Sequence, residues 1–242
     1  MNRILFEKSE IIDGCATLAD FRAEHILKVL HGEVGQILKT GEIDALIGTS
    51  EITAIGGGKV SVKVNHFEES VAPWFDLVLA PPRPRVMKRL LPQLAALGVG
   101  RIILVGAEKV EKDFWGATLL KDEVNRPLLI DALMQAGTSI LPKIEIWKSF
   151  RRWAREGVGG LGRGARYVAH PYGESAVSRP VIGADEGSGE RTTIAIGPEG
   201  GWTESEVETL EANGFKRYSL GKRILRSDTA TVAVIAQLMK GR

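Results

Sequence analysis

The chain has 242 residues, of which 44% are hydrophobic and 26% are charged, a composition that suits a globular protein with a sizeable core. Its formal net charge of +2 gives no overall sign of nucleic-acid binding. No apolar run approaches the roughly 18–20 residues of a membrane span, and the first residues lack the apolar stretch of a signal peptide. We therefore expect a cytoplasmic protein without membrane contact. The single cysteine, Cys15, excludes a disulfide framework and a cysteine-based zinc site, and we expect it to be buried or half-buried.

The first part of the chain, residues 1–72, has the pattern of a small β-rich unit. Short apolar or alternating runs are separated by glycines, which favours short strands joined by turns. One stretch, AEHILKVL at residues 23–30, has helical spacing instead. Strands at this spacing predict a small barrel. The expected strands are residues 3–6, 36–39, 45–47, 51–55 and 59–64.

The pattern changes near Pro73, where fully apolar strands begin to alternate with helices. This alternation predicts an α/β domain over residues 73–242, with a mostly parallel sheet covered by helices on both faces. The expected strands are residues 75–80, 101–106, 143–147, 166–169, 192–196 and 216–220. The expected helices are residues 85–97, about 115–138, 203–212 and 227–239. Two glycine-rich stretches, residues 155–165 and 183–190, are expected to be mobile loops.

Basic residues gather in three short stretches of the second part. Such patches build phosphate-binding surfaces, but a solvated protein face has the same composition, and the two interpretations stay open here. The first stretch contains Arg83, Arg85, Lys88, Arg89 and Arg101. The second contains Arg151, Arg152, Arg155, Arg163 and Arg166, and the third contains Lys222, Arg223 and Arg226.

Several familiar motifs are absent or out of context. Residues 157–162 match G-x-G-x-x-G, but an arginine-rich helical pattern precedes them, whereas a dinucleotide site needs a strand there. The four histidines lack the spacing of metal ligands, so we expect no metal site and a structural or surface role for each of them. These are His25, His31, His66 and His170.

The first informative motif is IGPEGG at residues 196–201, directly after an apolar strand. Ligands of open α/β folds bind at the carboxyl ends of strands. Pro198 makes this turn rigid, and its glycines allow another molecule to come close. Thr203 and Glu206 then form a capping-box pattern, which predicts that a helix begins at once. The segment is therefore a ligand loop or an ordinary strand–turn–helix connection.

The second motif, SLGKRILRSDTA at residues 219–230, favours the ligand loop. Ser227 is a suitable N-cap and Asp228 suits the start of a helix. Ile224 and Leu225 stand between cations in an exposed loop, which is unusual unless an apolar group such as an adenine ring covers them. Together the two loops predict one small-molecule site in an enzyme.

These two motifs, with the sequence around them, resemble the RsmE family of SPOUT methyltransferases. The resemblance is specific over residues 194–235 and fainter elsewhere. It implies a PUA-like RNA-binding barrel over residues 1–72, a trefoil-knotted methyltransferase domain over residues 73–242, and a homodimer. It also implies methylation of N3 of a specific uridine in the 16S ribosomal RNA of the small subunit, with S-adenosylmethionine as cofactor. The implied cofactor-binding residues are Ile196, Gly197, Pro198, Glu199, Gly200, Leu220, Gly221, Ile224 and Leu225.

Methyl transfer to N3 requires a nucleophile in line with the carbon–sulfur bond of the cofactor and removal of the N3 proton. Arg226 and Asp228 stand beside the second loop and are our candidate catalytic residues. Arg226 would contact the substrate, and a solvated cation is the alternative. Asp228 would act as the base, and a charge that stabilises the helix terminus is the alternative.

The chain departs from its family at several positions that would face RNA. His31, Gln93, Ala96, Thr138 and the pairs 109–110 and 227–228 differ from the usual residues. The departures leave two alternatives open. One is a different SPOUT activity, such as ribose 2′-O or tRNA base methylation, and the other is a non-catalytic ribosome-assembly protein that binds RNA.

Overall fold

The computed structural model describes residues 1–171 and 190–239. The chain forms two compact units. The first contains Met1–Ala72 and Leu129–Leu141, and the second contains Pro73–Leu128 and Pro142–Arg242. Among the described residues, no helix has the length and apolar character needed to cross a membrane.

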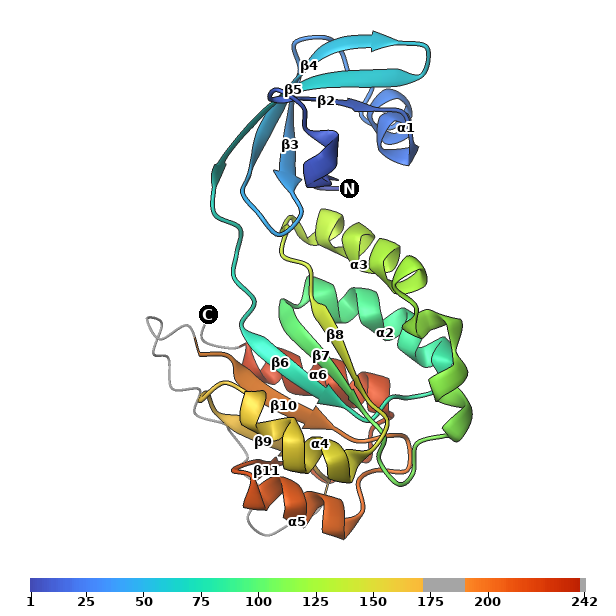
Figure 1. Ribbon diagram of the computed structural model, residues 1–242, viewed down its shortest axis with the longest axis vertical. Helices are drawn as coiled ribbons and strands as arrows, with labels where there is room; N and C mark the ends of the chain where they lie inside the picture. Colours follow the sequence, from blue (N-terminus) through green and yellow to red (C-terminus); the bar gives the residue numbers. More distant parts are fainter. Residues whose placement is uncertain (172–189, 240–242) are drawn as a thin grey trace. The chain divides into compact units, whose positions relative to one another are not determined.

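The first unit is built on a five-stranded sheet with the order β1-β3-β4-β5-β2 (Figure 1). Its strands are β1 (Ile4–Phe6), β2 (Cys15–Leu18), β3 (Ile37–Glu42), β4 (Ile47–Gly56) and β5 (Lys59–Glu68). The sheet curls into a half-barrel around buried apolar residues such as Phe6, Leu18 and Ile52. Helix α1 (Phe21–Lys28) begins at Asp20, whose carboxylate accepts a hydrogen bond from the main chain of Arg22 at 2.9 Å. The small barrel expected from the strand spacing is therefore present as a half-barrel, in which β1 and β2 are edge strands.

Two details of this sheet differ from expectation. Strand β4 is continuous through Gly48, where the sequence predicts a break. A Cβ atom on Gly48 would lie 2.3 Å from the carbonyl oxygen of Asn65 on β5. Gly48 thus permits a close approach of two strands and does not mark a turn. Cys15 was expected to be buried or half-buried but is exposed, since it lies on the outward face of β2, a strand that the pattern did not reveal.

The second unit contains a six-stranded sheet with the order β11-β9-β10-β6-β7-β8, and every pair in it is parallel. The mostly parallel sheet is therefore confirmed. Its strands are β6 (Phe75–Leu79), β7 (Val99–Val105), β8 (Lys143–Trp147), β9 (Arg166–Ala169), β10 (Thr192–Ile196) and β11 (Lys216–Tyr218). All six strands end at the same edge of the sheet. The loops that follow them therefore gather there.

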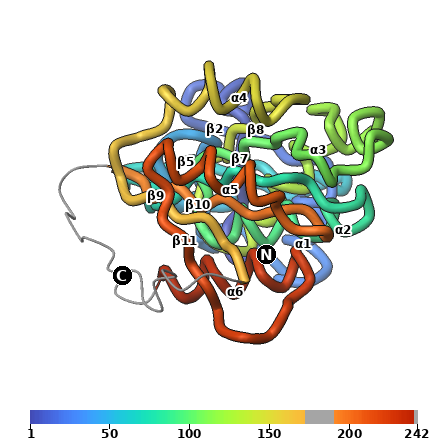
Figure 2. The backbone as a smooth tube through the Cα atoms, turned by 90° about the horizontal axis from the view of Figure 1, so that it is seen from below, coloured from blue at the N-terminus to red at the C-terminus, as the bar shows by residue number. Residues whose placement is uncertain are grey.

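Helices cover both faces of this sheet, as expected (Figure 2). Helix α2 (Pro84–Ala96) packs on β7 and on α6 (Ser227–Leu238), which in turn contacts β10. On the other face, α4 (Phe150–Glu156) and α5 (Glu204–Ala212) bury an aromatic and aliphatic core against the sheet. Trp153 is at the centre of that core and is 1% exposed. The sheet is thus sealed on both faces, and its carboxyl edge is where a ligand can enter.

Two expected elements have different bounds. The helical stretch near 115–138 begins as two 3-10 turns, η2 (Lys112–Gly116) and η3 (Thr118–Leu120), and continues as α3 (Asp122–Ala136). The loop expected over residues 155–165 instead contains the end of α4 and the 3-10 turn η4 (Val158–Gly160). Val158 and Leu161 are buried in the core, so apolar contacts outweigh the flexibility that the glycines suggest. The loop expected at 183–190 lies outside the described residues, except for Glu190.

A buried carboxylate ties three strands together at their amino ends. Asp76 on β6 is 1% exposed and accepts hydrogen bonds from Arg101 on β7 at 2.7 Å and from Arg191, just before β10, at 2.7 Å. Burial opposes the charge of Arg101, but hydrogen bonding and the nearby charge of Asp76 raise the pKa of Arg101 overall. Arg101, a member of the first basic patch, therefore forms a structural ion pair with Asp76.

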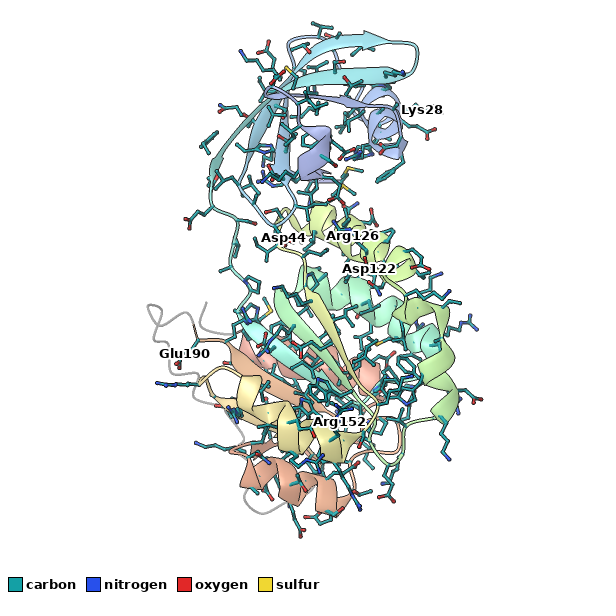
Figure 3. All side chains as sticks on the ribbon, in the orientation of Figure 1. Lys28, Asp44, Asp122, Arg126, Arg152 and Glu190 are labelled. Carbon is teal, nitrogen blue, oxygen red and sulfur yellow. The ribbon has the colours of Figure 1, made fainter. Side chains whose placement is uncertain are left out.

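Most of the second basic patch is also engaged in contacts within the protein. Arg152, labelled on α4 in Figure 3, pairs with Glu156 at 2.8 Å, and Arg155 pairs with the same carboxylate at 2.7 Å. Arg166 donates hydrogen bonds to the carbonyl oxygens of Asn213 and Gly162. These arginines fit the solvated-face interpretation better than a phosphate-binding surface.

We predict that Asp76→Asn lowers the free energy of unfolding by about 2–4 kcal/mol, because it removes the buried carboxylate that Arg101 and Arg191 share. Urea denaturation followed by circular dichroism measures the change. Glu156→Gln is the matched control, since its carboxylate also pairs with two arginines but at the surface, and its denaturation midpoint should not move. Equal midpoints for both variants would contradict this role for Asp76.

Candidate functional site

The two predicted loops meet at the carboxyl edge of the parallel sheet. One follows β10 and the other follows β11, and β9 lies between these two strands. Together with the residues that follow β7 and β9, the loops surround a cavity of about 660 Å³. Its size is typical of small-molecule sites, which are roughly 300–1,000 Å³. All nine residues expected to hold the cofactor line it: Ile196, Gly197, Pro198, Glu199, Gly200, Leu220, Gly221, Ile224 and Leu225.

The first loop is a tight turn fixed by close contacts. The main-chain N–H of Gly201 donates to the carbonyl oxygen of Pro198 at 2.8 Å. A Cβ atom on Gly197 would lie 2.9 Å from the main-chain nitrogen of Trp202, and one on Gly200 would lie 2.9 Å from the side chain of Lys109. At Gly197 only glycine fits without a shift of the loop, whereas at Gly200 the flexible side chain of Lys109 would have to move. Lys109 also donates from Nζ to the carbonyl oxygen of Gly200 at 2.9 Å.

The helix after this loop begins as the sequence predicts. Thr203 and Glu206 form a capping box at the start of α5, which confirms that prediction. The Glu206 carboxylate is buried and also accepts the main-chain N–H of Glu108 at 2.8 Å. One carboxylate therefore fixes the loop after β7 to the start of α5. Lys109 is the residue directly after Glu108, whose main chain this carboxylate holds.

The second loop presents apolar side chains to solvent. Gly221 has a φ of +110°, a conformation that disfavours other residues, and its N–H donates to the Ser219 hydroxyl at 3.1 Å. Ile224 is 73% exposed, and Leu220 and Leu225 are about one-third exposed. No described residue covers Ile224, so the unusual apolar surface expected from the sequence is present in the fold.

Polar groups of the same cavity supply donors and charges. Trp202 is 5% exposed, and its indole N–H has no acceptor among the described residues, although buried donors are nearly always paired. Arg217 pairs with Glu211 at 2.9 Å, and hydrogen bonds to Glu211 and Glu204 raise the pKa of Arg217. Burial raises the pKa of Tyr218. Within the described residues, no cluster of histidine, cysteine or carboxylate side chains is arranged to hold a metal ion.

The two candidate catalytic residues lie beside the cavity and do not line it. Arg226 is exposed and is the N-cap residue of α6, between two lining residues, Leu225 and Ser227. Asp228 lies in the first turn of α6, and its carboxylate is 3.4 Å from a guanidinium nitrogen of Arg89 on α2. This ion pair links α2 to α6. The catalytic assignment of both residues stays a prediction.

Some wall residues escaped the sequence analysis. Lys109 follows β7, and His170 follows β9 with its main-chain N–H bonded to the carbonyl oxygen of Tyr218 at 3.0 Å. Trp202 closes the first loop. The available signal was their place just after a predicted parallel strand, because such positions lie at the ligand edge of the sheet. For His170 the sequence predicts only a structural or surface role, whereas the residue lines the cavity.

Comparisons with known proteins show which family the chain resembles. Residues 69–239 match the family described as the RNA methyltransferase domain. Ribosomal RNA small subunit methyltransferase E of Treponema pallidum is 33% identical, with 99% of this chain and 91% of that protein covered. Ribosomal RNA small subunit methyltransferase E 1 of Borreliella burgdorferi is 25% identical, with 96% and 95% covered.

A solved structure has the same fold. It is a ribosomal RNA small subunit methyltransferase E from Neisseria gonorrhoeae bound to S-adenosyl methionine, with a TM-score of 0.72 and 23% identity, and 98% of this chain and 96% of that chain are covered. The match to the domain family and the full-length relatives lead to one conclusion: the chain belongs to the ribosomal RNA small subunit methyltransferase E family, within the RNA methyltransferase domain family.

Proposed function

We propose that this protein is an S-adenosylmethionine-dependent methyltransferase that methylates N3 of a uridine in the 16S ribosomal RNA of the small subunit. The observation that carries the proposal is that all nine expected cofactor-binding residues, which come from both motif loops, line one cavity. The names of its full-length relatives support ribosomal RNA of the small subunit as the substrate. The choice of N3 of uridine rests on the resemblance of the two loops to the RsmE family.

The residues present fit the proposed cofactor. The exposed side chains of Ile224, Leu220 and Leu225 offer an apolar surface for an adenine ring. Gly197 and Gly200 leave the main chain of the first loop bare on the cavity wall, and Trp202, another lining residue, has an indole N–H without an acceptor among the described residues. When bound, S-adenosylmethionine supplies an activated methyl group on a positively charged sulfur, so the reaction needs no metal ion.

The protein's own task is to position the base and manage one proton. N3 lies on the Watson–Crick edge of uridine, so the target must be unpaired or flipped out of its helix. Its N–H proton must leave before the lone pair can attack, and a cation near the base lowers the cost of the resulting negative charge. Arg226 is exposed next to the cavity and serves this role in our proposal. Asp228 accepts the proton, and Arg89 holds its carboxylate in place.

Further parts of the proposal rest on the family resemblance. Residues 1–72 form a PUA-like RNA-binding domain, and residues 73–242 form the methyltransferase domain, whose last segment is threaded into a trefoil knot. The protein is a cytoplasmic homodimer in which the partner subunit completes each site. The open half-barrel of the first unit is compatible with the RNA-binding role, because one sheet can present a continuous surface.

We predict that Gly197→Ala weakens S-adenosylmethionine binding at least about tenfold, which corresponds to about 1.4 kcal/mol. The added Cβ would lie 2.9 Å from the main chain of Trp202 and would push the first loop out of position. Gly159→Ala is the control, since nothing lies within 4 Å of its Cβ position. Isothermal titration calorimetry measures both variants, and equal affinities would argue against a cofactor role for the first loop.

The proposed reaction is tested by mapping modified nucleotides. Small ribosomal subunits from a strain that lacks the gene are incubated with the purified protein and S-adenosylmethionine, and the ribosomal RNA is analysed by mass spectrometry. We expect one new N3-methyluridine. A 2′-O-methylated ribose, or a modification of transfer RNA instead, would indicate another methyltransferase activity. Cofactor binding without any methyl transfer would indicate a non-catalytic assembly protein.

The same assay tests the candidate catalytic residue. Arg226→Ala should lower the turnover number by roughly 100-fold or more while the calorimetric affinity for S-adenosylmethionine stays unchanged, because the side chain acts on the base and not on the cofactor. Lys216→Ala removes an exposed cation from β11 in the same unit and should keep full turnover. Full turnover of Arg226→Ala would remove the assignment.

A further inference from the structure

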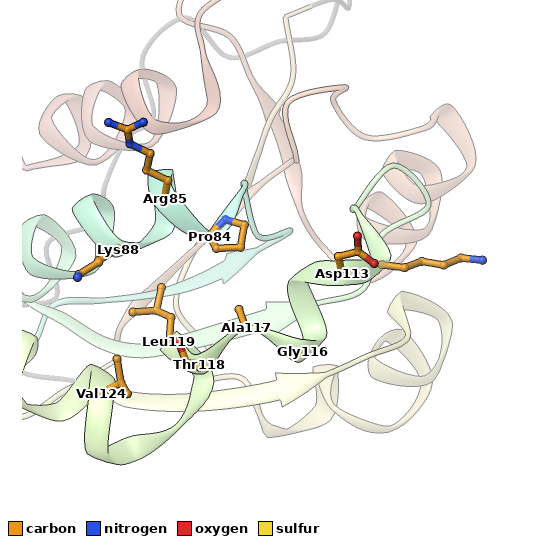
Figure 4. Close-up of a pocket in the computed structure, with 10 residues that line it drawn as sticks. Pro84, Arg85, Lys88, Asp113, Gly116, Ala117, Thr118, Leu119 and Val124 are labelled. Carbon is orange, nitrogen blue, oxygen red and sulfur yellow. The ribbon is translucent and has the colours of Figure 1, made fainter.

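A second cavity lies on the same unit, outside the cofactor site. It has a volume of about 760 Å³ and is bounded by the first turns of α2 and by the segment from η2 to α3 (Figure 4). Its apolar floor includes Pro84, Leu119 and Val124, and Thr118 adds a hydroxyl group. We name it the α2 groove. None of its ten lining residues belongs to the cofactor cavity.

The α2 groove carries an excess of positive charge. Arg85, Lys88 and Lys112 line it against a single carboxylate, that of Asp113. All three cations are exposed. Within residues 1–171 and 190–239, no ion pair neutralises any of them, whereas their neighbours Arg83 and Arg89 pair with Glu111 and Asp228. The groove therefore combines Arg85 and Lys88 of the first basic patch with a third cation, Lys112.

The placement of one of these cations is unfavourable for the helix itself. Arg85 lies in the first turn of α2, where the helix dipole disfavours positive charge, and Lys88 lies in the next turn. The first turn of α2 contains no acidic residue, and its N-cap residue makes no side-chain capping bond. Groups that oppose local stability in this way are typical of functional surfaces. An anion in the groove would offset both the charges and the dipole.

The chain connects the α2 groove directly to the cofactor cavity. Arg83, next to the groove residue Pro84, donates its main-chain N–H to the carboxylate of Glu199 in the cofactor loop at 3.1 Å. The Arg83 side chain pairs at 2.8 Å with Glu111, the neighbour of the groove residue Lys112. The residue before α2 is thus bonded to the cofactor loop, and both cavities include residues that follow β7, at the edge of the sheet where the target nucleotide would be methylated.

We propose that the α2 groove binds backbone phosphates of the substrate RNA next to the methylated nucleotide, through Arg85, Lys88 and Lys112. This inference rests on the proposed function, which supplies the RNA substrate. Phosphate contacts fix the register of the RNA without reading its sequence, so the groove would position the target nucleotide at the cofactor cavity. It would contribute to RNA affinity and not to the chemical step.

The test compares RNA binding by two triple variants. The groove variant is Arg85→Ala, Lys88→Ala and Lys112→Ala. The control is Lys143→Ala, Lys148→Ala and Lys216→Ala, which removes the same charge from exposed positions of the same unit outside both cavities. Fluorescence anisotropy measures binding of a 16S ribosomal RNA transcript at several salt concentrations. Calorimetry with S-adenosylmethionine and a mass measurement in solution report on folding and assembly.

For the groove variant we expect RNA affinity to fall by about 10–100-fold and the slope of log affinity against log salt to become shallower by about 2, since each single-strand phosphate contact contributes about 0.7. Its affinity for S-adenosylmethionine and its mass should equal those of the wild type. The control should change RNA affinity by less than about threefold.

Three results would overturn the inference: unchanged RNA affinity in the groove variant, an equal loss in the control, or a change of oligomeric state, which would make the groove a subunit interface. Failure of the proposed function gives a different result. In that case the wild-type protein binds RNA through the groove but transfers no methyl group, which supports the groove inference and contradicts the proposed enzyme activity.

Discussion

The parallel direction of all six strands in the second unit is the constraint on which the site depends. It brings every strand-to-helix loop to one edge of the sheet. The glycine loop follows β10 and the apolar loop follows β11, about twenty residues later in the sequence. They share a cavity because one strand, β9, is all that separates β10 from β11 in the sheet. At the opposite edge, Asp76 joins the starts of β6, β7 and β10 through Arg101 and Arg191. The buried ion pairs of Asp76 thus lie at one edge and the ligand-facing backbone at the other.

What the sequence could predict follows from how local each signal is. The loops at 196–201 and 219–230 are continuous motifs, so the sequence alone identifies their residues, and the structure confirms the capping box at Thr203. Lys109 and His170 join the same wall only because of strand order, which no local pattern contains. The half-barrel shows the same limit, because closure depends on whether β1 and β2 meet, and strand spacing does not determine that.

Glycine was the least reliable guide, because it serves several purposes. In the first loop, Gly197 and Gly200 permit close contacts beside a ligand cavity. At Gly48 a glycine instead lets two strands approach within a continuous strand, where the sequence suggested a turn. Gly157 stands between Trp153 and Val158, and burial of these two apolar residues favours helical turns where a loop was expected. Tertiary packing decided each outcome, and it cannot be read from the glycine itself.

Charge in this protein divides into paired structural groups and unpaired groups at the surface. Arg101, Arg152 and Arg155 are held by carboxylates of the same unit. Arg85, Lys88 and Lys112 have no such partner among the described residues, and the main chain of Arg83, just before α2, is bonded to the cofactor loop. This division explains how a chain with a net charge of only +2 can still present a local basic surface to RNA.

The most direct test of the central claim is a crystal structure of the protein with S-adenosylhomocysteine, the product form of the cofactor. The account predicts that the ligand lies between the loop at Gly197–Gly200 and the loop at Leu220–Leu225, with its adenine ring on Ile224 or Leu225. It also predicts an acceptor atom of the ligand within hydrogen-bond distance of the Trp202 indole N–H. A ligand bound elsewhere, for example in the α2 groove, or no binding at millimolar concentration would contradict the account.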